Sequence, residues 1–160
     1  MSLRDKIGLR IATFEIAIVA AFVLPAVRVA AMRVPLPRLR SVLHAALAAD
    51  GRPASIAARD VGRCVAAVGR RLPGIGTCLT HALVTEALLH RFRLPAEFVI
   101  GVERSSEFGF RAHAWVESAG TVVVGDAMDL NRFVPLASGS DIGLHRSPAP
   151  PTSVGKEVLR

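Results

Sequence analysis

Hydrophobic positions recur at helical spacing through the first half of the chain and alternate with polar positions in the second half. The pattern predicts helices over residues 41–49, 55–72 and 78–91, the first of them after a turn at residues 36–40. Ser55 and Thr77 are the expected N-caps of the second and third helices. Strand patterns cover residues 97–102, 112–117 and 121–125, and residues 133–136 form a short edge strand. Helices that precede strands predict an α+β fold, in which a helix packs on an antiparallel sheet.

The apolar segment from Ile11 to Val34 has two interpretations. Its longest run without a charge, residues 16–27, is shorter than the roughly 20 residues that a membrane-spanning helix needs. One interpretation is a buried helix that packs on the rest of the chain or on a partner protein. The other is a helix on a membrane surface, with Arg4, Lys6 and Arg10 at the lipid headgroups.

Length and composition fit one domain, because 160 residues with a hydrophobic fraction of 51% suffice for a core. The formal charge of +7 indicates attraction to acidic surfaces such as anionic lipid, a phosphorylated ligand or an acidic peptide. The basic residues are mostly scattered arginines, and the chain has one Trp and no Tyr. No nucleic acid is therefore expected as a partner, because such interfaces combine basic stripes with aromatic side chains.

Cys64 and Cys78 are the only cysteines of the chain. Their spacing allows a disulfide, but a small secreted scaffold would need more pairs and a signal peptide, so we expect a cytoplasmic protein. No Cys-x-x-Cys or His-Glu-x-x-His motif accompanies the five histidines. The sequence therefore predicts no metal site and implies no cofactor.

Cys78, His113 and Asp126 are the candidate catalytic residues. Cys78 opens an amphipathic helix, where the helix dipole and unpaired N–H groups favour a thiolate. His113 begins the strand-like sequence His-Ala-Trp-Val-Glu, in which Trp115 shares its face and either shields it from water or fills the core. A two-residue loop at Ala119-Gly120 sets Asp126 directly opposite His113, so that the carboxylate orients the ring. A three-residue loop would instead put the two residues on opposite faces unless a bulge restored the phase. A thiol, an imidazole and a carboxylate together are typical of nucleophilic catalysis.

These candidates have rival interpretations. Cys78 taken alone is also compatible with a small hydrophobic residue at a helix start, and Cys64 is expected in the core. Asp129 is a rival for Asp126, although it lies beyond the predicted strand. His81, one turn after Cys78, either lines the site or is a surface residue. No catalytic role is predicted for Glu117, His44, His90 and His145.

The chain resembles the transglutaminase-like cysteine peptidases that mature lasso peptides, a family related to the C-terminal part of the microcin J25 processing protein. The resemblance runs from about Arg70 to Leu136. It rests on Arg-Leu-Pro-Gly-Ile-Gly-Thr-Cys-Leu at 71–79, Pro-Ala-Glu-Phe-Val-Ile-Gly-Val at 95–102, His-Ala-Trp-Val-Glu at 113–117, Gly-Asp at 125–126 and Arg-Phe-Val-Pro-Leu at 132–136. The combination of a Cys-Leu helix start with the histidine strand is its most specific part.

The resemblance implies a transglutaminase-like or papain-like fold, with the cysteine at a helix N-terminus packed on an antiparallel sheet that carries the histidine and the aspartate. It implies Cys78 as nucleophile, His113 as base and Asp126 as orienting acid, and the Cys78 N–H is the evident oxyanion donor. The implied activity is removal of the leader from a ribosomally made precursor peptide. A macrolactam cyclase that resembles asparagine synthetase would then act on the freed core.

The expected organisation has three parts. Residues 1–72 form a helical region that packs on the core, on a partner or on a membrane, residues 73–137 form the catalytic core, and residues 138–160 form a loosely ordered tail. Because the first part reads as helical, we expect a separate small leader-binding protein as partner. Two other functions stay open, namely acyl transfer by the same triad and a noncatalytic scaffold associated with a membrane. The expected location is the cytoplasm, with a membrane surface as a further contact.

Overall fold

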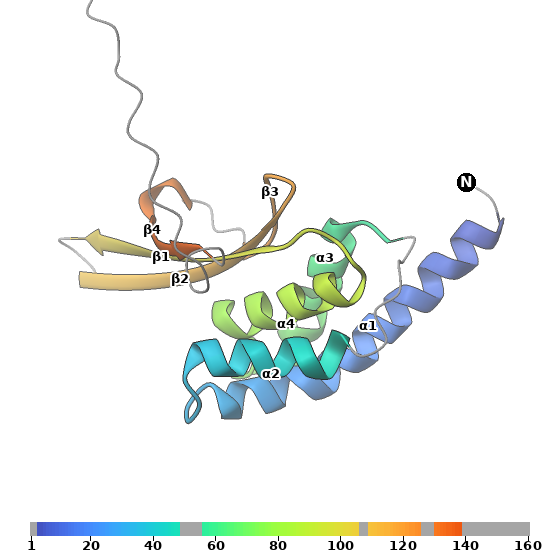
Figure 1. The fold of residues 1–160 in the computed structure, drawn as a ribbon, viewed down its shortest axis with the longest axis horizontal. Coiled ribbons are helices and arrows are strands. Elements are labelled where there is room, and N and C mark those ends of the chain that lie inside the picture. Colours follow the sequence, from blue (N-terminus) through green and yellow to red (C-terminus); the bar gives the residue numbers. More distant parts are fainter. Residues whose placement is uncertain (1–2, 49–55, 106–108, 126–129, 139–160) are drawn as a thin grey trace, which may run out of the picture.

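The computed structural model describes residues 3–48, 56–105, 109–125 and 130–138. Within these residues the helices are α1 (Leu3–Ala30), α2 (Leu36–Ala48), α3 (Ala58–Arg70) and α4 (Cys78–Arg91). The strands are β1 (Glu97–Ser105), β2 (Gly109–Ser118), β3 (Thr121–Val124) and β4 (Val134–Ser138), and a short 3-10 helix, η1 (Leu130–Arg132), precedes β4. The predicted α+β fold is confirmed: the sheet lies over α4, and α1 and α2 lie beneath α4 (Figure 1).

α1 packs one face on the core and exposes apolar residues on the other. The buried face, which contacts α3 and α4, consists of Ala12, Ile16, Ala20, Leu24 and Val27. The exposed apolar residues are Ile11, Phe14, Ile18, Phe22 and Val29. Over Gly8–Ala30 the mean hydropathy is 1.9, so α1 is long and apolar enough to cross a membrane by length and composition, a criterion that core helices of soluble proteins and signal sequences also meet.

The starts of α2 and α3 differ from the prediction. Residues 36–40, predicted as a turn, form the first turns of α2, because a proline near a helix start lacks only an N–H that would have no partner there. α3 begins at Ala58 after the N-cap Ala57, so the predicted N-cap Ser55, which lies outside the described residues, is wrong. Ile56 is buried in the core and Ala57 is extended, so the helix begins only after the buried Ile56 side chain has been placed.

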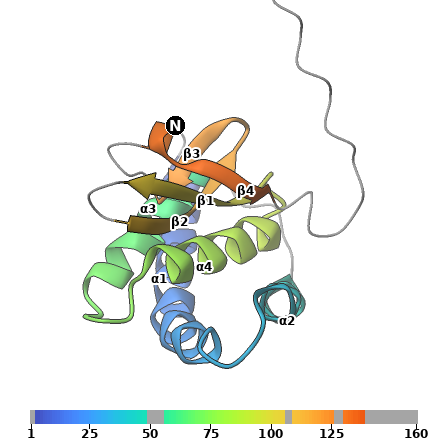
Figure 2. The same cartoon turned by 90° about the vertical axis from the view of Figure 1, so that its left-hand side faces the viewer.

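α4 is the central helix, and it begins at Cys78 as predicted. Thr77 caps it: the Thr80 N–H donates to Thr77 Oγ1 over 3.3 Å, and the Thr77 N–H donates to Thr80 Oγ1 over 2.9 Å. Residues 82–89 are all buried, because α4 contacts the other three helices and the sheet. Figure 2 shows α4 between the sheet and the pair α1 and α2.

The sheet has the strand order β3-β2-β1-β4, and its neighbouring strands are antiparallel. Ala114 and Val116 of β2 belong to the main core with the helices. Trp115 points to the other face, where it packs with Val99 and Phe133 in a second, smaller core. The predicted alternation along the histidine strand is therefore confirmed, and β4 is an edge strand as predicted.

Candidate active site

Cys78 and His113 line one pocket of about 640 Å³. Cys78 lies in the first turn of α4, and His113 lies on β2. The other lining residues come from α3, from α4 and from the end of β3: Gly62, Arg63, Ala66, Ala67, Arg70, His81, Val123, Val124 and Gly125. In the described part of the chain no hydrogen bond joins Cys78 to His113. The structure thus brings two of the three predicted residues to one pocket.

The ring of His113 is held by a backbone carbonyl. Its Nε2 atom lies 2.7 Å from the Gly125 oxygen. A carbonyl only accepts hydrogen bonds, so Nε2 carries the hydrogen, and Nδ1 is the acceptor in the neutral ring. Trp115 stacks near the ring with centroids 6.2 Å apart, and Phe133 lies at 5.3 Å. These contacts fix the tautomer and restrict the orientation of the imidazole.

The hairpin that carries His113 differs from the predicted register. The two-residue loop is present, with positive φ at both positions, and the pairing beside it is as predicted. A bulge then shifts the register by one residue, and the ladder ends with Val116 opposite Val124. The predicted register therefore holds only as far as Glu117 opposite Val122, and the predicted opposition of His113 and Asp126 lies beyond the described ladder and stays a prediction. Asp126 and its rival Asp129 lie outside the described residues, so the identity of the third member stays a prediction.

Gly125 makes the contact to His113 possible. Its φ is +81°, and a Cβ atom there would lie 2.6 Å from the Ala114 oxygen and 2.8 Å from the Cβ of Trp115. Only a glycine allows the backbone to come this close to β2 at this angle. In the sequence Gly125 is recognisable only as part of the Gly-Asp motif, because its contact with His113 depends on the fold.

His81 lines the pocket one turn after Cys78, which favours the first of its two predicted interpretations. Its Nε2 atom is buried and has no hydrogen-bond partner among the described residues. The ring fits because Gly69 and Gly76 lack side chains: a Cβ on Gly69 would lie 1.8 Å from Nε2. Burial, and secondly the charge of Arg70, lower the pKa of His81. The imidazole is therefore neutral at pH 7.

The start of α4 offers a donor for an oxyanion. The Thr80 N–H is satisfied by the Thr77 side chain, whereas the Cys78 N–H has no acceptor within the described segments. Unpaired N–H groups at a helix N-terminus stabilise negative charge. The Cys78 N–H is therefore available to the oxygen of a substrate carbonyl under attack by the Cys78 sulfur.

Cys64 has a different environment from Cys78. It packs against the main core from α3, as predicted, and its sulfur lies 3.6 Å from the Thr13 oxygen of α1. Burial raises the pKa of the Cys64 thiol. Both cysteines are free, so the disulfide that their spacing allowed does not form. Cys64 therefore lacks the features expected of a nucleophile.

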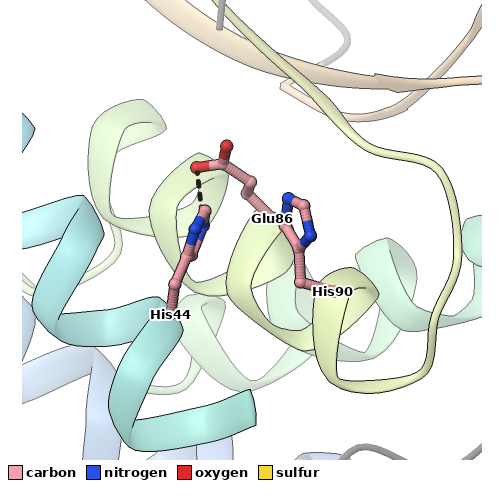
Figure 3. A group of neighbouring side chains, drawn as sticks. All are labelled: His44, Glu86 and His90. Carbon is pink, nitrogen blue, oxygen red and sulfur yellow. Dashed lines mark ion pairs between the residues drawn. The ribbon is translucent and has the colours of Figure 1, made fainter. Parts of the chain in front are cut away.

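A second polar cluster lies between α2 and α4 and contains His44 and His90, for which no catalytic role was predicted. Figure 3 shows both rings beside Glu86, which is 2% exposed, and the three side chains have potential metal-ligand atoms within 4.8 Å of one another. Arg40, however, donates to both oxygens of Glu86. Arg40 already neutralises the carboxylate, and a metal ion there would be repelled by the guanidinium group. We therefore describe the Arg40–Glu86 ion pair, which joins α2 to α4, as an ionic clamp.

Comparison with characterised proteins and with solved structures gives no match. A family model does match: that of the transglutaminase-like superfamily, over residues 20–138. The match runs from within α1 to the end of β4 and includes the whole pocket of Cys78 and His113. Because it covers well over half of the chain, the protein belongs to the transglutaminase-like superfamily.

Proposed function

We propose that the protein is a cysteine peptidase, with Cys78 as nucleophile and His113 as base. The observation that carries the proposal is the pocket that both residues line, in which Gly125 leaves Nδ1 of the neutral His113 ring as the proton acceptor. Membership of the transglutaminase-like superfamily supports thiol chemistry of the peptidase or acyltransferase kind. The alternative of a buried structural cysteine fits Cys64 better than Cys78.

The proposed reaction has two steps. His113 takes the proton of the Cys78 thiol, the sulfur forms a bond to the scissile carbonyl carbon, and the Cys78 N–H stabilises the oxyanion. The C–N bond then breaks, and the leaving amine takes the proton from the imidazolium. In the second step a water gives a proton to His113 and its hydroxyl group to the thioester carbon. The C–S bond then breaks, which releases the acid, and the imidazolium returns the proton to the Cys78 sulfur.

The proposed substrate is a ribosomally made lasso-peptide precursor, from which the enzyme removes the leader. This rests on the motifs at 71–79 and 113–117 that resemble the lasso-peptide peptidases. The proposed partners are a small leader-binding protein and a macrolactam cyclase, which act with this chain in the cytoplasm. The leader-binding protein would raise the local concentration of the scissile bond at Cys78.

The test uses a synthetic lasso-peptide precursor with its leader and follows the products by mass spectrometry. Wild-type protein and the Cys64→Ala control should give two fragments, and Cys78→Ala and His113→Ala should give none, since members of such a unit are not additive. An adduct of the acyl fragment with an added amine would identify an acyltransferase instead. Biological output that survives Cys78→Ala would favour the noncatalytic scaffold and overturn the peptidase.

Two further measurements test the partners. The cleavage rate should rise when the leader-binding protein is added, and an equal rate without it would refute the split arrangement. Sedimentation with vesicles that contain anionic lipid tests the membrane contact of α1. Sedimentation of wild type that is lost when the exposed Phe14 and Phe22 are changed to Ser would place α1 on lipid, and failure to sediment would favour α1 as a helix of the core alone.

A further inference from the structure

The α3 wall of the pocket carries two arginines. Arg63 and Arg70 both line the pocket of Cys78 and His113, and both are exposed. They lie seven residues apart, so they share one face of α3 and are separated by about 10.5 Å along its axis. Ala66 and Ala67 line the wall between them. This side of the pocket therefore has small side chains in its middle and an arginine at each end.

Among the described residues, these two arginines form no ion pair. Arg40 and Arg91 form ion pairs with Glu86 and Glu15, whereas in the part of the chain that the structure describes neither Arg63 nor Arg70 has such a pair. The described lining residues of the pocket include no acidic side chain. Arg70 also acts electrostatically inside the pocket, because its charge contributes to the lowered pKa of His81. The charged side chains among the described lining residues are therefore positive.

We infer that the pocket takes a peptide segment with acidic side chains, which Arg63 and Arg70 bind as it lies extended along α3. This inference names the substrate class of the proposed peptidase and rests on that function. A guanidinium group matches a carboxylate with two parallel hydrogen bonds, and arginine keeps its charge at any working pH. In an extended peptide, which rises about 3.3 Å per residue, side chains at positions i and i+4 lie on one face about 13 Å apart, and the flexible side chains of two arginines about 10.5 Å apart can reach both. The favoured segment therefore has two acidic residues four positions apart.

The cleavage experiment compares synthetic peptides of one sequence that differ only in the Glu or Gln residues placed near the scissile bond. One peptide has Glu at two positions four residues apart, a second has Glu at two adjacent positions, and a third has Gln in place of both Glu residues of the first. Wild type should have the highest kcat/KM on the first peptide. Each of Arg63→Gln and Arg70→Gln should lower the ratio of kcat/KM for the first peptide over the third by about three- to fivefold, chiefly through KM, as expected for exposed ion pairs.

Two variants sharpen the result. Arg59→Gln removes the same charge from an exposed position of α3 that does not line the pocket, and it should leave the ratio unchanged. The double variant Arg63→Glu, Arg70→Glu should prefer a peptide with Lys at the two positions. Equal ratios in wild type and both Gln variants, or an equal fall in the Arg59→Gln control, would overturn the inference.

A binding measurement separates this inference from the proposed function. Cys78→Ala protein cannot form a thioester, so fluorescence anisotropy with the labelled first peptide reports binding alone. Weaker binding in Arg63→Gln and Arg70→Gln on this background, and not in Arg59→Gln, would support the anionic-peptide site even if wild type cleaves none of the peptides. Binding that does not depend on the two arginines would refute it, whether or not cleavage occurs.

Discussion

The carbonyl oxygen of Gly125 lies 2.7 Å from Nε2 of His113, so the backbone itself holds the ring of the proposed base. This contact requires the positive φ of Gly125 and the absence of a Cβ atom. The hydrogen bond fixes the tautomer, but an uncharged carbonyl stabilises an imidazolium less than a carboxylate does. Gly125 is thus a positioning residue, and the carboxylate that would complete the triad must come from elsewhere.

Gly125→Ala should therefore damage both stability and activity. A non-glycine residue at positive φ costs about 1–2 kcal/mol, and the contact with the Ala114 oxygen adds about 1–3 kcal/mol. Gly120→Ala is the matched control, because Gly120 has a φ of +73° but open space around its Cβ position. Urea unfolding should show the larger loss in Gly125→Ala, and only this variant should lose cleavage. Equal losses of stability and activity in the two variants would contradict the positioning role.

Asp126→Asn should slow cleavage by at least about tenfold without unfolding the protein, because an amide does not stabilise the imidazolium that forms at His113. Asp129→Asn is the control and should have a mild effect. The measurement is kcat on the precursor, with circular dichroism to check the fold. If Asp129→Asn is the more damaging change, the third member of the triad is Asp129 and the prediction from the sequence is wrong.

The start of α4 and the hairpin loop were predictable because their signals are local. Thr77 can cap only the helix that follows it, and Gly120 readily adopts the positive φ of a two-residue hairpin loop, although Ala119 adopts its φ of 49° at a cost. The bulge beyond the loop was not predictable, since it depends on how β3 packs against α3. A Cβ on Gly62 of α3 would lie 2.0 Å from the Val123 oxygen, so the helix and the bulged strand are fitted to each other.

Contacts between residues far apart in the sequence were also not predictable. Glu86 lies on a helix face where the sequence pattern gave it no role, and its partner Arg40 is 46 positions away. The two arginines that line the pocket could not be recognised from the sequence for the same reason. In the sequence Arg63 and Arg70 are two of many scattered basic residues. Only the packing of α3 beside Cys78 brings both to the lining of one pocket.

His81 should make stability depend on pH. Its pKa is lowered in the folded protein by burial and by Arg70, so the unfolded chain binds the proton more readily. The neutral ring therefore contributes stability above the unfolded pKa of about 6.5, and that contribution is lost as the pH falls from there through the folded pKa. The free energy of unfolding should fall more between pH 7.5 and pH 5.5 in wild type than in His81→Gln. His90, whose pKa is also lowered, is present in both proteins and cancels in the comparison. An equal fall in both would contradict a buried, neutral His81.

Arg40→Met should be strongly destabilising at neutral pH. Burial alone would raise the pKa of Glu86, but the hydrogen bonds and charges of His44 and Arg40 outweigh it and lower the pKa. Without Arg40 the nearly inaccessible carboxylate loses its main partner, which typically costs about 3–5 kcal/mol.

The double variant Arg40→Met, Glu86→Leu is the control for the ionic clamp. It should recover most of the loss, because a packed apolar pair replaces the ions without leaving a buried charge. In wild type the contribution of Glu86 is present above its unfolded pKa of about 4.3 and disappears as the pH falls through the lower folded value. The difference between wild type and Arg40→Met in urea unfolding should therefore shrink at acid pH. A loss below about 1 kcal/mol in Arg40→Met at pH 7, or a double variant no more stable than the single one, would show that Arg40 and Glu86 do not hold α2 on α4 in this way.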